Sequence, residues 1–186
     1  MARSFCFVLL IFLLSNNVSA DRLYIGAGFS SISLHSDHPS INDQNGAGYQ
    51  LLAGTRSENW GMEISVTGGL TFNTGPTPGI YYPEDSAEYG NLGLGVKRYF
   101  HPKNHAKLSP WMGAGVGMHF VTWDTYFYEV SGLGYSVAGG VDYEVTPGWF
   151  VRGGAIFHFF DSDDTYDYGP YDDKSTQMSF ILIRLF

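Results

Sequence analysis

The chain has 186 residues and a formal net charge of −8, with 24 glycines, 17% aromatic residues and only 15% charged residues. Its length fits one domain, and its acidity argues against a nucleic-acid partner, because basic patches bind phosphates. The single cysteine, Cys6, lies near the start of the chain. If that segment is removed on export, disulfides, cysteine-ligated metals and cysteine nucleophiles are all excluded.

The first twenty residues have the three parts of a secretory signal. A short positive start, Met1–Arg3, precedes an apolar run over 5–14 and a polar stretch that ends in small residues at Val18-Ser-Ala20. The alternative is a membrane anchor helix, but the apolar run has only half of the roughly 20 residues that a spanning helix needs. We therefore expect a signal peptide over 1–20 and one domain over 21–186.

After the signal, segments of alternating polarity predict β-strands, in which successive side chains point to opposite faces. The first segment places Leu23, Ile25 and Phe29 on one face and Tyr24 and Ser30 on the other. The last segment is apolar on both faces, so its register is left open. The eight predicted strands are 22–33, 46–56, 58–72, 88–100, 108–121, 132–145, 149–160 and 175–186.

The predicted connections alternate in length. Those at 56–59, 101–107 and 146–148 are short, and those at 34–45, 73–87, 122–131 and 161–174 are long. Thirteen acidic residues fall in or beside the long connections, against the single basic Lys174. Outer-membrane barrels have short periplasmic turns and longer extracellular loops, so the long connections are expected outside the cell.

Composition of the two faces separates two kinds of eight-stranded barrel. One face carries Leu, Val, Ile, Met and Tyr, and the other mostly Gly, Ala and Ser with a few charges. A soluble, lipocalin-like barrel would turn the large apolar face inward, whereas a membrane barrel turns it toward lipid. Small residues suit a narrow lumen and would make a poor aqueous exterior. The predicted fold is all-β, an eight-stranded antiparallel up-and-down transmembrane β-barrel.

Several motifs together resemble the small outer-membrane β-barrel family, the OmpA/OmpX-like and opacity-protein-like group. They are Leu23-Tyr-Ile-Gly-Ala-Gly-Phe29, Arg98-Tyr-Phe100 leading into Leu108-Ser-Pro-Trp-Met-Gly-Ala-Gly-Val-Gly117, Gly139-Gly-Val-Asp-Tyr143 and the terminal Phe186. The resemblance implies insertion by the barrel assembly machinery, with Phe186 as part of the assembly signal. Arg184 departs from the family pattern, which has an apolar residue there. Either the assembly signal is weak, or the strand is shifted so that Ile183 and Leu185 face lipid.

Five charged residues of the predicted strands point inward by their parity: Glu63, Lys97, Asp142, Glu144 and Arg152. An eight-stranded barrel is just wide enough for its own side chains to fill, so these charges must pair. A structural plug of salt bridges is one interpretation. A proton or ion path is the other, and it needs a continuous column of water.

His119 and His158 are also predicted to face the lumen, near its extracellular mouth. With Asp124 or Asp161 they could hold a ligand or metal, or form a histidine–carboxylate base. The resemblance also brings in two enzyme families, lipid A palmitoyltransferases and deacylases. The first needs a helix before the barrel, and the second a His-x-Ser arrangement that His158-Phe-Phe-Asp-Ser162 lacks. We therefore assign no catalytic residue.

A dense run of carboxylates precedes the last strand, including Asp161, Asp163, Asp164 and Asp167. Its spacing partly resembles a calcium loop, but the turn glycine and the closing glutamate are missing. A solvated loop is one interpretation, and weak cation binding shared with lipopolysaccharide is the other.

Taken together, the sequence predicts a non-enzymatic outer-membrane protein for envelope structure and surface interaction, such as adhesion or host contact, through four acidic extracellular loops. The alternative is a narrow channel for small or apolar solutes. We expect a monomer without cofactor or bound metal. Its expected partners are outer-membrane lipid, lipopolysaccharide, the assembly machinery and host or surface ligands.

Overall fold

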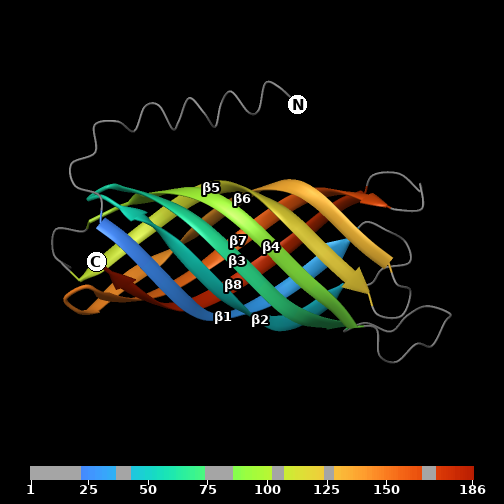
Figure 1. The fold of residues 1–186 in the computed structure, drawn as a ribbon, viewed down its shortest axis with the longest axis horizontal. Helices are drawn as coiled ribbons and strands as arrows, with labels where there is room; N and C mark the ends of the chain where they lie inside the picture. The colour runs from blue at the N-terminus through green and yellow to red at the C-terminus, as the bar shows by residue number, and fades with distance from the viewer. Residues whose placement is uncertain (1–21, 37–42, 74–85, 102–106, 124–127, 165–170) are drawn as a thin grey trace, which may run out of the picture.

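The computed structural model describes residues 22–36, 43–73, 86–101, 107–123, 128–164 and 171–186. They form eight strands: β1 (Arg22–Ser36), β2 (Gln44–Arg56), β3 (Trp60–Asn73), β4 (Ser86–Tyr99), β5 (Leu108–Trp123), β6 (Tyr128–Thr146), β7 (Trp149–Asp164) and β8 (Tyr171–Leu185). Each strand pairs antiparallel with the next, and β1 pairs with β8 to close the barrel (Figure 1). The predicted signal peptide, 1–20, lies outside the described residues. No helix that is long and apolar enough to cross a membrane occurs in the described part of the chain.

The two faces of the strands follow the alternation in the sequence. On β1, Leu23 and Phe29 are 64% and 78% exposed on the outer surface, whereas Tyr24 and Ser30 are buried in the lumen. The outer surface as a whole is covered by large apolar side chains. This inverted arrangement, with apolar groups outside and polar groups buried inside, is that of a barrel surrounded by lipid. The predicted fold class is confirmed.

One end of the barrel has short connections, and β1 begins and β8 ends there (Figure 1, left). We call it the short-turn end, and the opposite end the long-connection end. At the long-connection end the strands run further than predicted, because the pairing of β7 with β8 continues to Ser162 and Tyr171. Asp161 and Lys174, expected in a loop, therefore lie within strands.

The structure decides the register of β8. Ile181 and Ile183 are buried, whereas Leu182 faces outward. The shifted register, with Ile183 and Leu185 facing lipid, is therefore wrong. The physical reason is the space opposite, where Gly26 of β1 has no side chain and both isoleucines reach into the lumen over it.

Two apolar clusters occupy the lumen at different heights. The lower cluster, near the short-turn end, consists of Tyr24, Leu52, Phe150, Ile181 and Ile183, with Leu185 packed against it. The upper cluster, toward the long-connection end, consists of Ile32, Leu34, Ala87, Tyr89 and Val121. Polar side chains share both levels, because Ile181 is the cross-strand partner of the buried Arg152 and Ala87 is the partner of the buried Thr71.

Candidate functional site

A layer of buried charges borders the lower cluster. Lys97 Nζ lies 2.6 Å from Glu63 Oε1, and Arg152 Nη1 donates to Glu63 Oε2. Arg152 also donates two hydrogen bonds to Asp142, from Nε to Oδ1 at 2.7 Å and from Nη2 to Oδ2 at 3.0 Å. All four side chains are at most 7% exposed. The structure thus brings together four of the five charged residues expected in the lumen.

A third cation, Arg56, completes this layer and was missed in the sequence. Its Nη1 lies 3.1 Å from Asp142 Oδ2, and its guanidinium lies 4.0 Å from the ring centre of Tyr99. Arg56 is the last residue of β2, and its parity with the buried Gln50 and Leu52 was the signal that could have placed it inside. We call Arg56, Glu63, Lys97, Asp142 and Arg152 the charge layer.

Aromatic side chains enclose the charge layer. The Tyr24 hydroxyl donates to Glu63 Oε2 at 2.8 Å, and Arg152 Nη2 donates to the Tyr99 hydroxyl at 3.1 Å. Trp111 lies against Lys97 and Arg152, and its ring centre is 4.4 Å from Lys97 Nζ. These contacts give the buried cations both hydrogen bonds and cation–π stabilisation.

Two glycines make room for the Trp111 indole inside the lumen. A methyl group on Gly140 would lie 2.7 Å from Trp111 Cζ2, and one on Gly154 would lie 2.9 Å from the same atom. Both distances are shorter than van der Waals contact. Small residues on the inner face therefore leave the space that the few large side chains of the lumen occupy.

Glu144, the fifth residue expected in the charge network, is the exception. Its Oε1 accepts a hydrogen bond from the backbone N–H of Gly148 at 3.4 Å, in the β6–β7 turn. The cause is local, because the pairing register shifts between Glu144 and Thr146 at the rim of the barrel. The prediction that Glu144 joins the buried charge network is therefore wrong.

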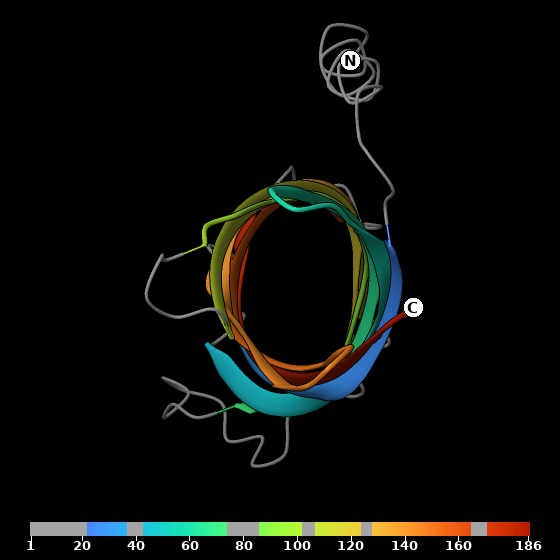
Figure 2. The same ribbon diagram turned by 90° about the vertical axis from the view of Figure 1, so that its left-hand side faces the viewer.

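Several of these contacts join strands on opposite sides of the barrel. Figure 2 shows the ring that the strands close. From the strand order around this ring of eight, β2 faces β6, β3 faces β7 and β4 faces β8. Arg56 reaches Asp142 across the first pair, and Glu63 reaches Arg152 across the second. Across the third pair, the Tyr89 hydroxyl lies 3.1 Å from Ser175 Oγ. Side chains therefore bridge the full width of the lumen at two heights.

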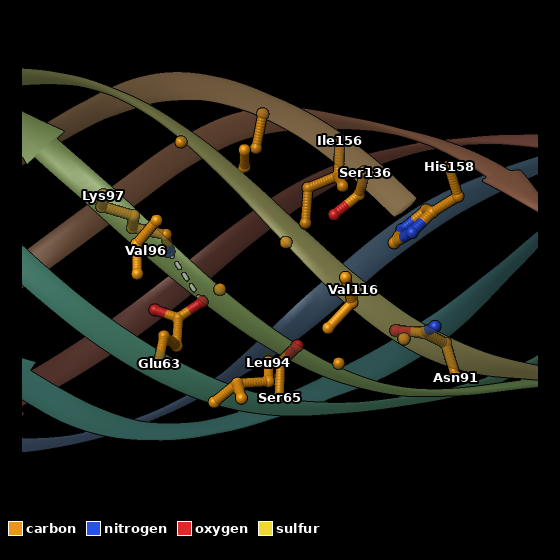
Figure 3. Close-up of a pocket in the computed structure, with 17 residues that line it drawn as sticks. Glu63, Ser65, Asn91, Leu94, Val96, Lys97, Val116, Ser136, Ile156 and His158 are labelled. Carbon is orange, nitrogen blue, oxygen red and sulfur yellow. Dashed lines mark hydrogen bonds and ion pairs between the residues drawn. The ribbon is translucent and has the colours of Figure 1, made fainter. Parts of the chain in front are cut away.

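A small cavity lies between the charge layer and the histidines. It has a volume of about 40 Å³, room for about three water molecules, and its wall on β4 and β5 includes the glycines 93, 95, 113, 115 and 117. Glu63 and Lys97 border it on one side and Asn91 and His158 on the other, with Ser136 between them (Figure 3). The cavity suits a few water molecules and leaves no room for a large solute.

His119 and His158 lie deeper than expected. They are 1% and 6% exposed, and the upper cluster lies between them and the long-connection end. His119 stacks on Phe160 with ring centres 4.2 Å apart and meets the edge of His158 at 4.8 Å. They are side chains of the lumen interior, because β5 and β7 continue beyond them.

The hydrogen-bond partners of the histidines are neutral. His119 Nδ1 lies 3.1 Å from the Tyr89 hydroxyl, and Asn91 Nδ2 lies 3.2 Å from His119 Nε2. His158 Nε2 is buried without a hydrogen-bond partner among the described residues. Asp161 is exposed, three positions from His158 and therefore on the opposite face of β7, so the structure does not bring together this possible pair. Asp124 lies outside the described residues.

The predicted carboxylate loop is only partly described. Asp161, Asp163 and Asp164 lie in β7, and Asp167 lies outside the described residues. Within the described ranges, no group of three or more His, Cys, Asp or Glu side chains could hold a metal ion. Because Asp167 lies outside those ranges, the possible cation site at the four aspartates stays a prediction.

Comparison with known proteins places the chain in a family. A model of the outer membrane protein beta-barrel domain matches residues 5–180, and the chain belongs to that family. It is a bacterial outer-membrane β-barrel protein. In barrels of this class the short turns usually face the periplasm. No protein with curated annotation matches the sequence.

Solved structures show the same fold at low sequence identity. Neisserial surface protein A is 17% identical, with 88% of this chain and 97% of that chain covered and a TM-score of 0.70. OprG of Pseudomonas aeruginosa is 12% identical, with 91% and 97% covered and a TM-score of 0.60. Ail of Yersinia pestis, solved with the heparin analogue sucrose octasulfate, is 14% identical, with 90% and 100% covered and a TM-score of 0.57.

Proposed function

We propose that this protein is a non-enzymatic surface protein with a closed lumen, which acts through its four long connections. The observation that supports this most directly is the set of contacts between opposite walls, above all Arg152 with Glu63 and Arg56 with Asp142. An ion path needs a continuous column of water. Here the lumen charges bind one another, the lower cluster packs beside them, and the upper cluster lies nearer the long-connection end.

The charge of the connections indicates the kind of partner. Thirteen acidic residues lie in or beside them, against Lys174 alone, so a cationic surface or one bridged by divalent ions suits them best. Ail was solved with a polyanion, and this chain is expected to have the opposite preference. Contacts with lipopolysaccharide, use of the assembly machinery with Phe186 as a signal, and a monomeric state belong to the same proposal.

A narrow channel for small or apolar solutes is the second candidate. The cavity walled by the glycines of β4 and β5 favours it, because a small side-chain movement could enlarge that space. Any solute would still have to displace both the charge layer and the upper cluster.

The surface role can be tested with three proteins displayed at equal levels on bacterial cells. They are the wild type, a variant with its long connections replaced by two-residue turns, and a variant of full length whose connection carboxylates are changed to amides. We expect adhesion to host cells to be lost in the first variant and reduced in the second. Equal adhesion by all three would contradict the proposal.

A further inference from the structure

Two arginines point outward into the membrane near the short-turn end, each beside a tryptophan. Arg98 of β4 is the cross-strand partner of Trp60, the first residue of β3, and its guanidinium carbon lies 4.8 Å from the indole ring centre. Arg184 of β8 is the partner of Trp149, the first residue of β7, at 5.1 Å. Arg184 also lies 5.9 Å from the ring centre of Phe186.

The two Trp–Arg units are equivalent in position. Each joins the first residue of one strand to the last-but-one residue of the next, and both lie on the outer face at the same end. The β3–β4 and β7–β8 pairs are half a turn of the barrel apart, so the units lie on opposite sides of it.

Neither arginine has an anionic partner in the described part of the chain. The inward-facing arginines, Arg56 and Arg152, both form ion pairs, whereas Arg98 and Arg184 lie against aromatic rings and form no ion pair with a described residue. A guanidinium stacked on a ring keeps its edge N–H donors free in a planar fork that matches phosphate oxygens. Tryptophan prefers the level of the lipid headgroups, so each unit holds its free donors at that depth.

Position in the membrane selects the anion. The units lie at the end with short turns, which faces the periplasm, and the lipids of that leaflet are phospholipids. Every phospholipid headgroup carries a phosphate, and an anionic headgroup adds net charge that attracts arginine. An arginine at the Arg184 position, where the family pattern has an apolar residue, is then explained by its ligand.

We propose that Trp60–Arg98 and Trp149–Arg184 are two binding sites for the phosphate of anionic phospholipids in the periplasmic leaflet, one on each side of the barrel. The sites do not depend on the surface role, because they lie at the other end of the molecule. They would fix the depth and tilt of the barrel by two contacts with the leaflet.

The test is lipid retention by the full barrel, measured by native mass spectrometry in uncharged detergent with phosphatidylglycerol added. We expect two retained lipids for the wild type, one each for Arg98→Gln and Arg184→Gln, and none for the double variant. The phosphatidylglycerol concentration is chosen so that a site weakened about fivefold, the value of one basic residue at an anionic surface, is no longer occupied. The single variants test two separate sites, so a folding defect in one leaves the other informative.

Lys174→Gln is the matched control. Lys174 is exposed and shares the outward parity of Arg184 on β8, but it lies toward the other end of that strand. The control should retain two lipids. Equal retention by the wild type and the double variant would overturn the proposal, and so would a loss in Lys174→Gln as large as in Arg184→Gln.

Discussion

Glu63 is the side chain on which the charge layer depends most. It accepts from Lys97, Arg152 and Tyr24 at once, and the layer holds three cations against two carboxylates. Loss of its charge leaves Lys97 buried without an anion, which typically costs about 3–5 kcal/mol. Glu63→Gln keeps the shape of the side chain and should lower the free energy of unfolding by about that amount, measured by urea titration in micelles.

The matched control for Glu63→Gln is Glu88→Gln. Glu88 is exposed on the outward face of β4, so its loss should change the free energy of unfolding by no more than about 0.5 kcal/mol. Adding Lys97→Met to Glu63→Gln should recover part of the lost stability, because the unpaired cation is then gone. Equal effects of the two glutamine variants would contradict the buried network.

At the level of the strands, the seam between β1 and β8 depends on a close backbone approach. A methyl group on Gly28 would lie 2.0 Å from the carbonyl oxygen of Phe180 and 2.7 Å from Ile181 Cα. Backbone atoms cannot rotate away as a side chain can. Gly28→Ala should therefore force the strands apart at the seam and lower the free energy of unfolding by about 1–3 kcal/mol.

Gly153→Ala tests the same change without the contact. Gly153 lies on the exposed face of β7, and a methyl group there meets no atom within 4 Å. Its effect should be neutral or stabilising by up to about 1 kcal/mol, because alanine restricts the unfolded chain. If the two alanine variants unfold at the same urea concentration, the seam is not closed as described.

Alternation of polarity predicted the strands because lipid outside and a narrow lumen inside impose opposite demands on successive residues. It failed where those demands end. Asp161 and Lys174 lie in strands, because pairing outlasts the apolar pattern at the long-connection end. For β8, both faces are apolar, so parity alone could not choose between Ile183 and Leu182.

The site was predictable in its residues more than in its contacts. The inward parity of Glu63, Lys97, Asp142 and Arg152 followed from the pattern, and their pairing followed from the cost of buried charge. Arg56 and Glu144 lie at strand ends, where a local turn decides whether a side chain reaches inward. Parity with Gln50 and Leu52 indicated the inward side for Arg56, but no sequence signal showed that the turn would draw Glu144 away from the charge layer.

For the whole molecule, closure predicts a simple behaviour on detergent gels. A barrel in which β1 pairs with β8 has no free strand edge from which detergent can open it. The unboiled protein should remain folded and migrate differently from the boiled protein. Identical migration of the two samples would contradict a closed barrel.

The closed lumen is the central claim, and conductance of the purified protein in planar bilayers tests it most directly. The charge layer and the upper cluster each bridge the lumen, so the wild type should insert without steady current. Insertion is checked separately. Protein recovered from the bilayer-forming vesicles should migrate on a gel as the folded, unboiled form, and its absence there would show a failure to insert. A steady single-channel current with a linear voltage dependence would contradict the closed lumen.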